Sequence, residues 1–110
     1  MNSENVLNTI KSFESQLVEI RRHLHAHPEV GFDLVNTKEY VKKQLEELGY
    51  EPVECGKAGL VVSAGGKKEG KVFLIRADMD ALPIKEEADV EFAATNGNMH
   101  ACGHDMYTTM

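Results

Sequence analysis

The residue types best suited to chemistry lie near the C-terminal end of the sequence, in the run HACGHD at residues 100–105. Cysteine, histidine and carboxylate side chains bind borderline divalent cations such as zinc. Cys102 and His104 are two residues apart. In an extended segment both side chains would face one side, whereas on a helix they would diverge by roughly 200°. We therefore predict that this pair binds a metal ion as part of a larger site. The alternative is a small buried thiol beside a hydrogen-bonded imidazole.

A second acidic pair lies in the run ADMDALP, directly after an apolar stretch at residues 72–77. Asp78 and Asp80 would face the same side of an extended chain. In open α/β sheets, ligands bind beyond the carboxyl ends of the strands. The two carboxylates could bind a cation there or orient a ligating histidine. An ordinary acidic turn is the alternative, and the nearby Cys102–His104 pair favours the functional interpretation.

Three histidines, His23, His25 and His27, end the first predicted helix. His23 and His27 have the i, i+4 spacing of some zinc sites. Basic side chains also suit the negative end of a helix dipole, and Pro28 disfavours helical geometry at the residue before it. We favour this structural interpretation over metal binding.

The remaining reactive groups have simpler interpretations. Cys55 has no basic neighbour that would activate a thiol, so we predict a structural role. A disulfide to Cys102 is not expected, because the sequence has two cysteines and no export signal. The acidic pairs at residues 46–47 and 86–87 are expected on a solvated helix face and in an exposed loop.

The elements that position these residues follow from periodicity. Apolar residues recur every three or four positions over residues 4–25, which predicts an amphipathic helix. A second helix is predicted from an N-cap at Asn36, with Glu39 completing a capping box, to Gly49. Strands are predicted around Val53, at residues 60–64 and at residues 72–77, with an exposed turn at residues 65–70. This order predicts the opening of an α/β domain.

Composition limits the class of protein. A chain of 110 residues forms at most one small domain, and a net charge of −6 argues against nucleic-acid and anionic-membrane partners. We find neither a membrane-span-length apolar run nor a signal peptide, so we expect a cytoplasmic location.

Three motifs carry a family resemblance: RRHLHAHPEVGF, LIRADMDALPI and MHACGHDMYTTM. Their order and spacing resemble those of the metal-dependent amidohydrolase branch of the M20 peptidases, which includes aminoacylase, hippurate hydrolase and auxin-conjugate hydrolase relatives. The resemblance implies an α/β fold, the N-terminal portion of a zinc-exopeptidase-like catalytic domain, with two helices followed by strands of a mixed sheet. Residues 1–110 would then be an incomplete catalytic domain, lacking its remainder and the dimerisation domain.

The resemblance also implies a function: hydrolysis of the amide bond of N-acyl amino acids or small peptides at a centre of two divalent metal ions. Zinc, manganese, cobalt or nickel would suit it. Cys102 and His104 would be metal ligands, and Asp80 would support the catalytic site. Asp78 occupies a position where distant relatives carry a ligating histidine, so its role stays open. The oligomeric state stays open, with a homo-oligomer as one alternative.

Two features set limits on this implied activity. In the family the general-base glutamate and other ligands follow the CGHD motif, so we expect the 110-residue chain to be inactive alone. Tyr107 also stands where relatives commonly carry histidine, and a phenol does not replace an imidazole at neutral pH. The alternatives are a truncated, non-catalytic remnant that acts through self-association or protein interaction, and a small stand-alone metal-binding protein.

Overall fold

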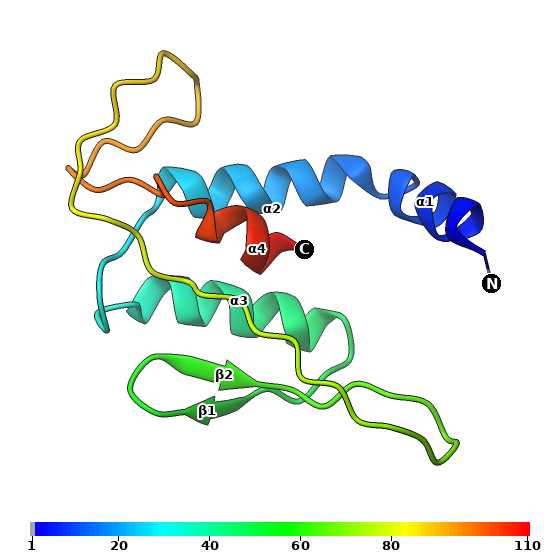
Figure 1. Ribbon diagram of the computed structural model, residues 1–110. Coiled ribbons are helices and arrows are strands. Elements are labelled where there is room, and N and C mark those ends of the chain that lie inside the picture. Colours follow the sequence, from blue (N-terminus) through cyan, green and yellow to red (C-terminus); the bar gives the residue numbers. More distant parts are fainter. Residues whose placement is uncertain (1) are drawn as a thin grey trace.

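The computed structural model describes residues 2–110 and contains four helices and one hairpin. The elements are α1 (Ser3–Lys11), α2 (Glu14–Ala26), α3 (Val35–Glu47), β1 (Val53–Cys55), β2 (Gly59–Val61) and α4 (His104–Thr109). Helix α4 packs against α2, while α3 lies beside the hairpin. The chain from β2 to α4 crosses from the hairpin side of the molecule to the α2 side (Figure 1). Within residues 2–110, no helix is long and apolar enough to cross a membrane.

The predicted first helix is present but divided in two at Ser12 and Phe13. The Ser12 hydroxyl donates a hydrogen bond of 2.6 Å to the carbonyl of Thr9. The backbone N–H of Phe13 donates to Ile10, three residues back, which tightens the turn. Serine side chains compete with helical backbone hydrogen bonds in this way. The division leaves α1 without any buried residue.

Helix α3 begins differently from the sequence prediction. Its N-cap is Leu34, which makes no side-chain hydrogen bond, and Asn36 lies inside the first turn. The Glu29 carboxylate accepts from the backbone N–H groups of Asn36 and Thr37 instead. The predicted capping box is therefore wrong, because a residue before the helix satisfies its free N–H groups.

The C-terminal end of α3 follows the prediction. Gly49 has a φ of +90° and follows the C-cap Leu48. Its N–H donates to Glu46, and the N–H of Tyr50 donates to Leu45. These two hydrogen bonds form a Schellman motif, which favours glycine at this position.

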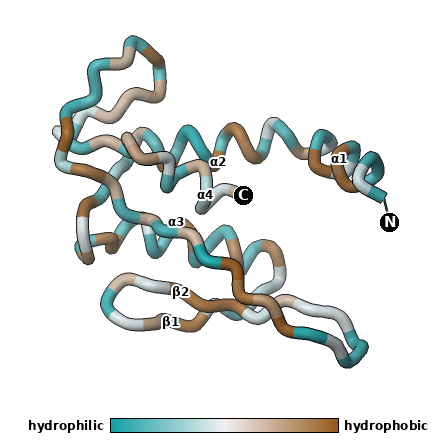
Figure 2. The backbone as a smooth tube through the Cα atoms, in the orientation of Figure 1, coloured by the Kyte–Doolittle hydropathy of each residue, from teal (hydrophilic) through white to brown (hydrophobic). Residues whose placement is uncertain are grey.

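The sheet is an antiparallel pair in which Val53 faces Val61 and Cys55 faces Gly59. The predicted strand at residues 72–77 lacks strand hydrogen bonds in the described chain, and its side chains from Val72 to Ile75 are 82–96% exposed. Figure 2 shows this extended apolar segment. An apolar run becomes a strand only where a neighbouring strand supplies hydrogen bonds, so the local signal alone was insufficient.

The core is small and partly polar. Its buried apolar side chains include two leucines and three alanines: Leu24, Leu34, Ala58, Ala81 and Ala94. Short backbone bridges bring residues 81–82 close to residue 30 and to Met99. These bridges place the acidic ADMDALP run between the end of α2 and the start of α4.

Candidate functional site

His104, the first residue of α4, is held by the acidic run. Its Nδ1 lies 2.8 Å from the backbone carbonyl oxygen of Asp80 and 3.1 Å from that residue's Oδ1. Both partners are acceptors, so Nδ1 carries the proton and donates. In the neutral ring Nε2 then keeps a lone pair, which is the tautomer of a metal-binding histidine with an acidic partner.

The second ring nitrogen of His104 faces Asp78. Nε2 lies 3.8 Å from Asp78 Oδ2, and both residues line a hollow of about 220 Å³ together with Arg76, Ala77 and Tyr107. The Asp78 backbone is fixed by the Thr108 hydroxyl, which donates to its carbonyl at 2.9 Å. Asp78 and Asp80 therefore do face the same side chain, as their spacing indicates. This nitrogen–carboxylate pair suits a divalent cation in its donor chemistry.

Cys102 lies on the bend before α4, and its thiol is free and exposed. Gly103 separates it from His104 with a φ of +93°, a left-handed conformation that glycine adopts without strain. Cys55 is also a free, exposed thiol, so the structure contains no disulfide between the two cysteines. Across residues 2–110, no group of three histidine, cysteine or acidic side chains is arranged to hold a metal ion.

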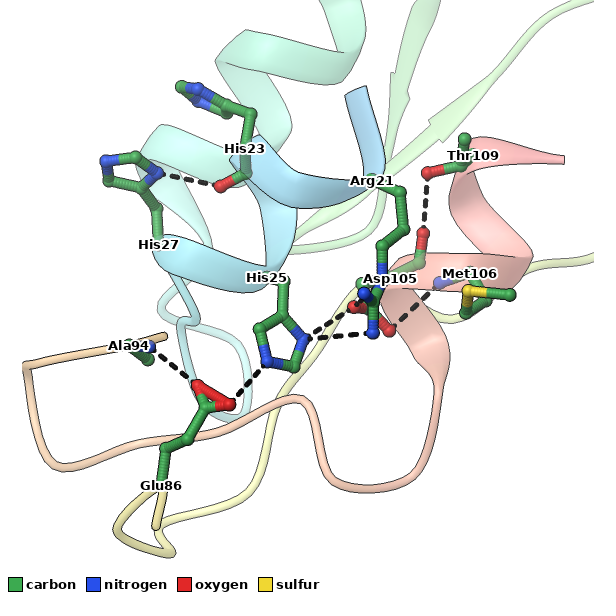
Figure 3. Close-up of polar contacts among 9 residues, drawn as sticks. All are labelled: Arg21, His23, His25, His27, Glu86, Ala94, Asp105, Met106 and Thr109. Carbon is green, nitrogen blue, oxygen red and sulfur yellow. Dashed lines mark hydrogen bonds and ion pairs between the residues drawn. The ribbon is translucent and has the colours of Figure 1, made fainter. Parts of the chain in front are cut away.

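A polar cluster, which we call the His25 cluster, lies beside this site: His25, Glu86 and Asp105 are buried, and Arg21 is partly exposed (Figure 3). His25 Nδ1 lies 2.8 Å from Asp105 Oδ2, and His25 Nε2 lies 2.7 Å from Glu86 Oε2. Arg21 Nε donates to the same Asp105 oxygen at 2.9 Å. The cluster joins α2, the loop after the acidic run, and α4.

Glu86 was expected in an exposed loop, and this expectation is wrong. Its side chain is 1% exposed, and its Oε1 accepts from the backbone N–H of Ala94 at 2.6 Å. Burial acts to raise the pKa of Glu86, but the hydrogen bonds from His25 and Ala94 outweigh burial and lower it. Glu86 is therefore an ionised carboxylate at neutral pH.

His100, the first residue of the HACGHD run, is buried beside both sites. Neither ring nitrogen has a hydrogen-bond partner among the described residues. Burial is the main effect on the pKa of His100, and it lowers that pKa. His25 and His104 lower it further, while the negative charge of Asp105 acts to raise it. The ring is therefore neutral.

The histidines at the end of α2 fall into two groups. His23 stacks between the rings of His27 and Tyr40, at 4.4 and 3.9 Å between centroids. His27 is the C-cap and has non-helical geometry, as Pro28 predicts. His25 points the other way, into the buried cluster (Figure 3).

Sequence reasoning missed the roles of His25, Glu86 and Asp105. A signal for His25 was present, because Leu17, Arg21, Leu24 and His25 follow the i, i+4, i+7, i+8 pattern of one helix face. Two ionisable residues on an apolar face indicate buried, paired charges. No local pattern marks Glu86, which becomes buried only through contacts with distant residues.

Comparison with known proteins places these residues in context. The sequence profile of Peptidase family M20/M25/M40 matches residues 74–110. The chain is 43% identical over 101 residues to the N-acetylcysteine deacetylase of Bacillus subtilis, covering 89% of this chain and 27% of that protein. It is 42% identical over 112 residues to the N-acyl-L-amino acid amidohydrolase of Geobacillus stearothermophilus, covering 100% of this chain and 30% of that protein.

The fold agrees with these sequence matches. A solved M20-family structure from Bacillus subtilis, described as a dinuclear metal binding peptidase, matches with a TM-score of 0.83 and 42% identity, over 90% of this chain and 28% of that protein. The chain is thus similar to this peptidase family over residues 74–110, and to these relatives over about nine tenths of its length or more. Its α/β fold matches the N-terminal part of M20 peptidase structures, as the three motifs predict. The chain spans less than a third of the length of these M20 relatives.

Proposed function

We propose that this chain contributes Cys102 and His104 to the two-metal centre of an amidohydrolase that cleaves the amide bond of N-acyl amino acids or small peptides. The observation that carries the proposal is the state of His104: its Nδ1 is bound to Asp80, while its Nε2 lies 3.8 Å from Asp78 Oδ2 and has no hydrogen-bond partner among residues 2–110. The names of the two relatives, an N-acetylcysteine deacetylase and an N-acyl-L-amino acid amidohydrolase, support the N-acyl amino acid substrate.

Each residue has a distinct role in this proposal. When bound, the metal ions lower the pKa of water and polarise the scissile carbonyl. Asp80 fixes the tautomer and ring direction of His104, and Cys102 supplies a thiolate. The family resemblance assigns proton transfer to a glutamate after the CGHD motif. We therefore propose that the 110-residue chain has no hydrolytic activity by itself.

Cobalt titration of the 110-residue chain tests the ligand assignment. Thiolate coordination to Co²⁺ produces an intense near-ultraviolet charge-transfer band. We expect this band in the wild type, its loss in Cys102→Ser, and weaker binding in His104→Ala. Cys55→Ser is the matched control, because that thiol is also exposed. A band that persists in Cys102→Ser but disappears in Cys55→Ser would contradict the assignment.

A hydrolysis assay tests the proposed inactivity of the chain alone. Metal-loaded chain is incubated with N-acetyl amino acids, and released amine is measured against metal and buffer alone. We expect no release above this background. Release that depends on both the metal and His104 would show that the chain is a complete catalyst.

One observation favours self-association as a second candidate function. The apolar side chains from Val72 to Ile75 are almost fully exposed on an extended segment, and such segments pair readily with another chain. Sedimentation velocity of the wild type and of Ile75→Lys would test this. If self-association is the function, the wild type should associate in a concentration-dependent way and Ile75→Lys should associate less. A wild type that stays monomeric would exclude this function.

A further inference from the structure

We propose that His25 is a positioning residue, which bridges Asp105 and Glu86 as an imidazolium and thereby fixes helix α4 and the direction of His104. The inference rests on the proposed function, because it assigns His25 an effect on the metal-binding residues. It goes beyond that proposal by giving a specific task to a buried histidine that does not itself bind the metal.

Both ring nitrogens of His25 contact carboxylates. Each ring nitrogen lies within 2.8 Å of a carboxylate oxygen. An ionised carboxylate is only an acceptor, so both ring nitrogens must donate. With Arg21, the His25 cluster then contains two cations and two anions. Buried charges need partners of opposite sign, because an unpaired charge removed from water costs free energy.

Helix α4 depends on the His25 cluster for its position. Asp105 is the buried residue of α4, with a side chain that is 0% exposed. The apolar side chains of Met106 and Tyr107 are half exposed or more, at 50% and 58%. Helix α4 therefore buries little apolar surface, and its position depends on polar contacts.

Asp105 and His104 are neighbours in the first turn of α4. Asp105 is held by Arg21 and His25 of α2, whereas His104 is held by Asp80 of the acidic run. We expect α4 to need the Asp105 anchor, because its other side-chain hydrogen bonds to the rest of the fold, from His104 and Thr108, both go to the acidic run. Loss of His25 would therefore misdirect Nε2 of His104 although the Asp80 contact remains.

Glu86 has a supporting part in this arrangement. Its Oε1 is held by the backbone of Ala94, while its Oε2 faces His25 Nε2. The aromatic ring of Phe92 packs edge-on against His25, with 5.6 Å between centroids. The loop thus encloses the imidazole and keeps water from competing for its two N–H groups.

Cobalt affinity of the 110-residue chain tests the proposal. We expect His25→Gln to weaken Co²⁺ binding by about 10–100-fold, the usual cost of losing a residue that orients a metal ligand. The matched control is His27→Gln, an exposed histidine two residues away, which should stay within about twofold of the wild type. Equal affinities in the two variants would overturn the positioning role.

A double variant separates positioning from loss of packing. In His25→Gln the new amide carbonyl faces Glu86, and two acceptors repel. Adding Glu86→Gln provides an amide donor, so a continuous chain of hydrogen bonds to Asp105 can form again. We expect the double variant to recover most of the lost affinity. A double variant that folds, as judged by circular dichroism, but binds Co²⁺ no better than His25→Gln would contradict the proposal. If His25→Gln itself fails to fold, a folded double variant that does not recover most of the wild-type Co²⁺ affinity would contradict it.

Nitrogen NMR of the histidine rings tests the charge state without metal. We expect both His25 nitrogens to be protonated at neutral pH, with N–H protons that exchange slowly with water. A single protonated nitrogen would refute the imidazolium. If the wild-type chain has a doubly protonated His25 but shows no Co²⁺–thiolate band, both the proposed function and the positioning role are contradicted. If the wild type shows the band but His25→Gln binds Co²⁺ with wild-type affinity, only the positioning role is contradicted.

Discussion

His25 and His104 lie on the two helices that pack together, α2 and α4, yet their surroundings differ. The His25 side chain is 5% exposed, and both of its ring nitrogens contact carboxylates at hydrogen-bond distance. The His104 side chain is 20% exposed, and only Nδ1 has such a contact. Two carboxylate partners fix a histidine as a charged structural bridge. One partner orients the ring and leaves the other nitrogen available to a ligand.

The strongest test of this comparison removes the carboxylate that anchors the His25 cluster. Asp105→Ala leaves the charges of Arg21 and His25 without their shared partner. We expect the free energy of unfolding to fall by about 3–5 kcal/mol, as in other broken buried ion pairs. Urea denaturation of the chain measures this, with the exposed Asp89→Ala as control. A loss no larger than that of the control would show that the cluster contributes little to stability.

The corresponding change beside His104 should affect binding rather than folding. Asp80→Asn weakens the acceptor of the Nδ1 proton, while the backbone carbonyl remains. We expect Co²⁺ affinity to fall by about tenfold, at the low end of such effects, with little change in unfolding. Isothermal titration and urea denaturation together measure both properties. The exposed Asp33→Asn serves as control, and a Co²⁺ affinity unchanged by Asp80→Asn would remove Asp80 from the site.

A pH series sharpens the comparison further. The pKa of Glu86 is lowered in the folded chain from an ordinary value of 4.5. Its ionised form therefore stabilises the fold fully above about pH 4.5, and this contribution is lost as the pH falls through the lowered folded pKa. We expect the unfolding free energy of Glu86→Gln to depend less on pH in this acidic range than that of the wild type. The exposed Glu87→Gln should retain the wild-type profile, and identical profiles for all three would contradict the prediction.

We expect the smallest effect on the free energy of unfolding at His27, which is the C-cap of α2 and lies outside the His25 cluster. Its Nδ1 donates to the carbonyl of His23 at 2.7 Å, on the exposed side of α2. His27→Gln should change the free energy of unfolding by at most about 1 kcal/mol. A loss as large as that of Asp105→Ala would show that the stacked histidines, and not His25, hold this end of α2.

Features set by local signals could be predicted from the sequence. Glycine at the end of α3 and the apolar periodicity of α2 both act within a few residues. The shared orientation of Asp78 and Asp80 toward His104 also follows from their spacing. The three motifs indicated the resemblance to M20 peptidases because they combine several such signals in a fixed order, and the family profile matches residues 74–110, which hold the second and third motifs.

Features that depend on distant contacts could not be predicted in this way. Glu29 caps α3 from outside the helix, and Glu86 becomes buried only because His25 and Ala94 approach it. Conversely, the apolar run from Val72 to Ile75 has the composition of a strand but no partner among residues 2–110. A sequence pattern specifies which face is apolar, whereas burial depends on what covers it.

The sequence separation within the His25 cluster has a kinetic consequence. Arg21 and His25 lie 84 and 80 residues from Asp105. Closing a loop of this length costs about 4 kcal/mol of chain entropy, by the logarithmic dependence on loop length. Helices α1 to α3 form from local contacts, so we expect docking of α4 to come late and to limit the rate of folding. Residues 104–109 would then acquire protection from hydrogen exchange last, after the helices that receive them.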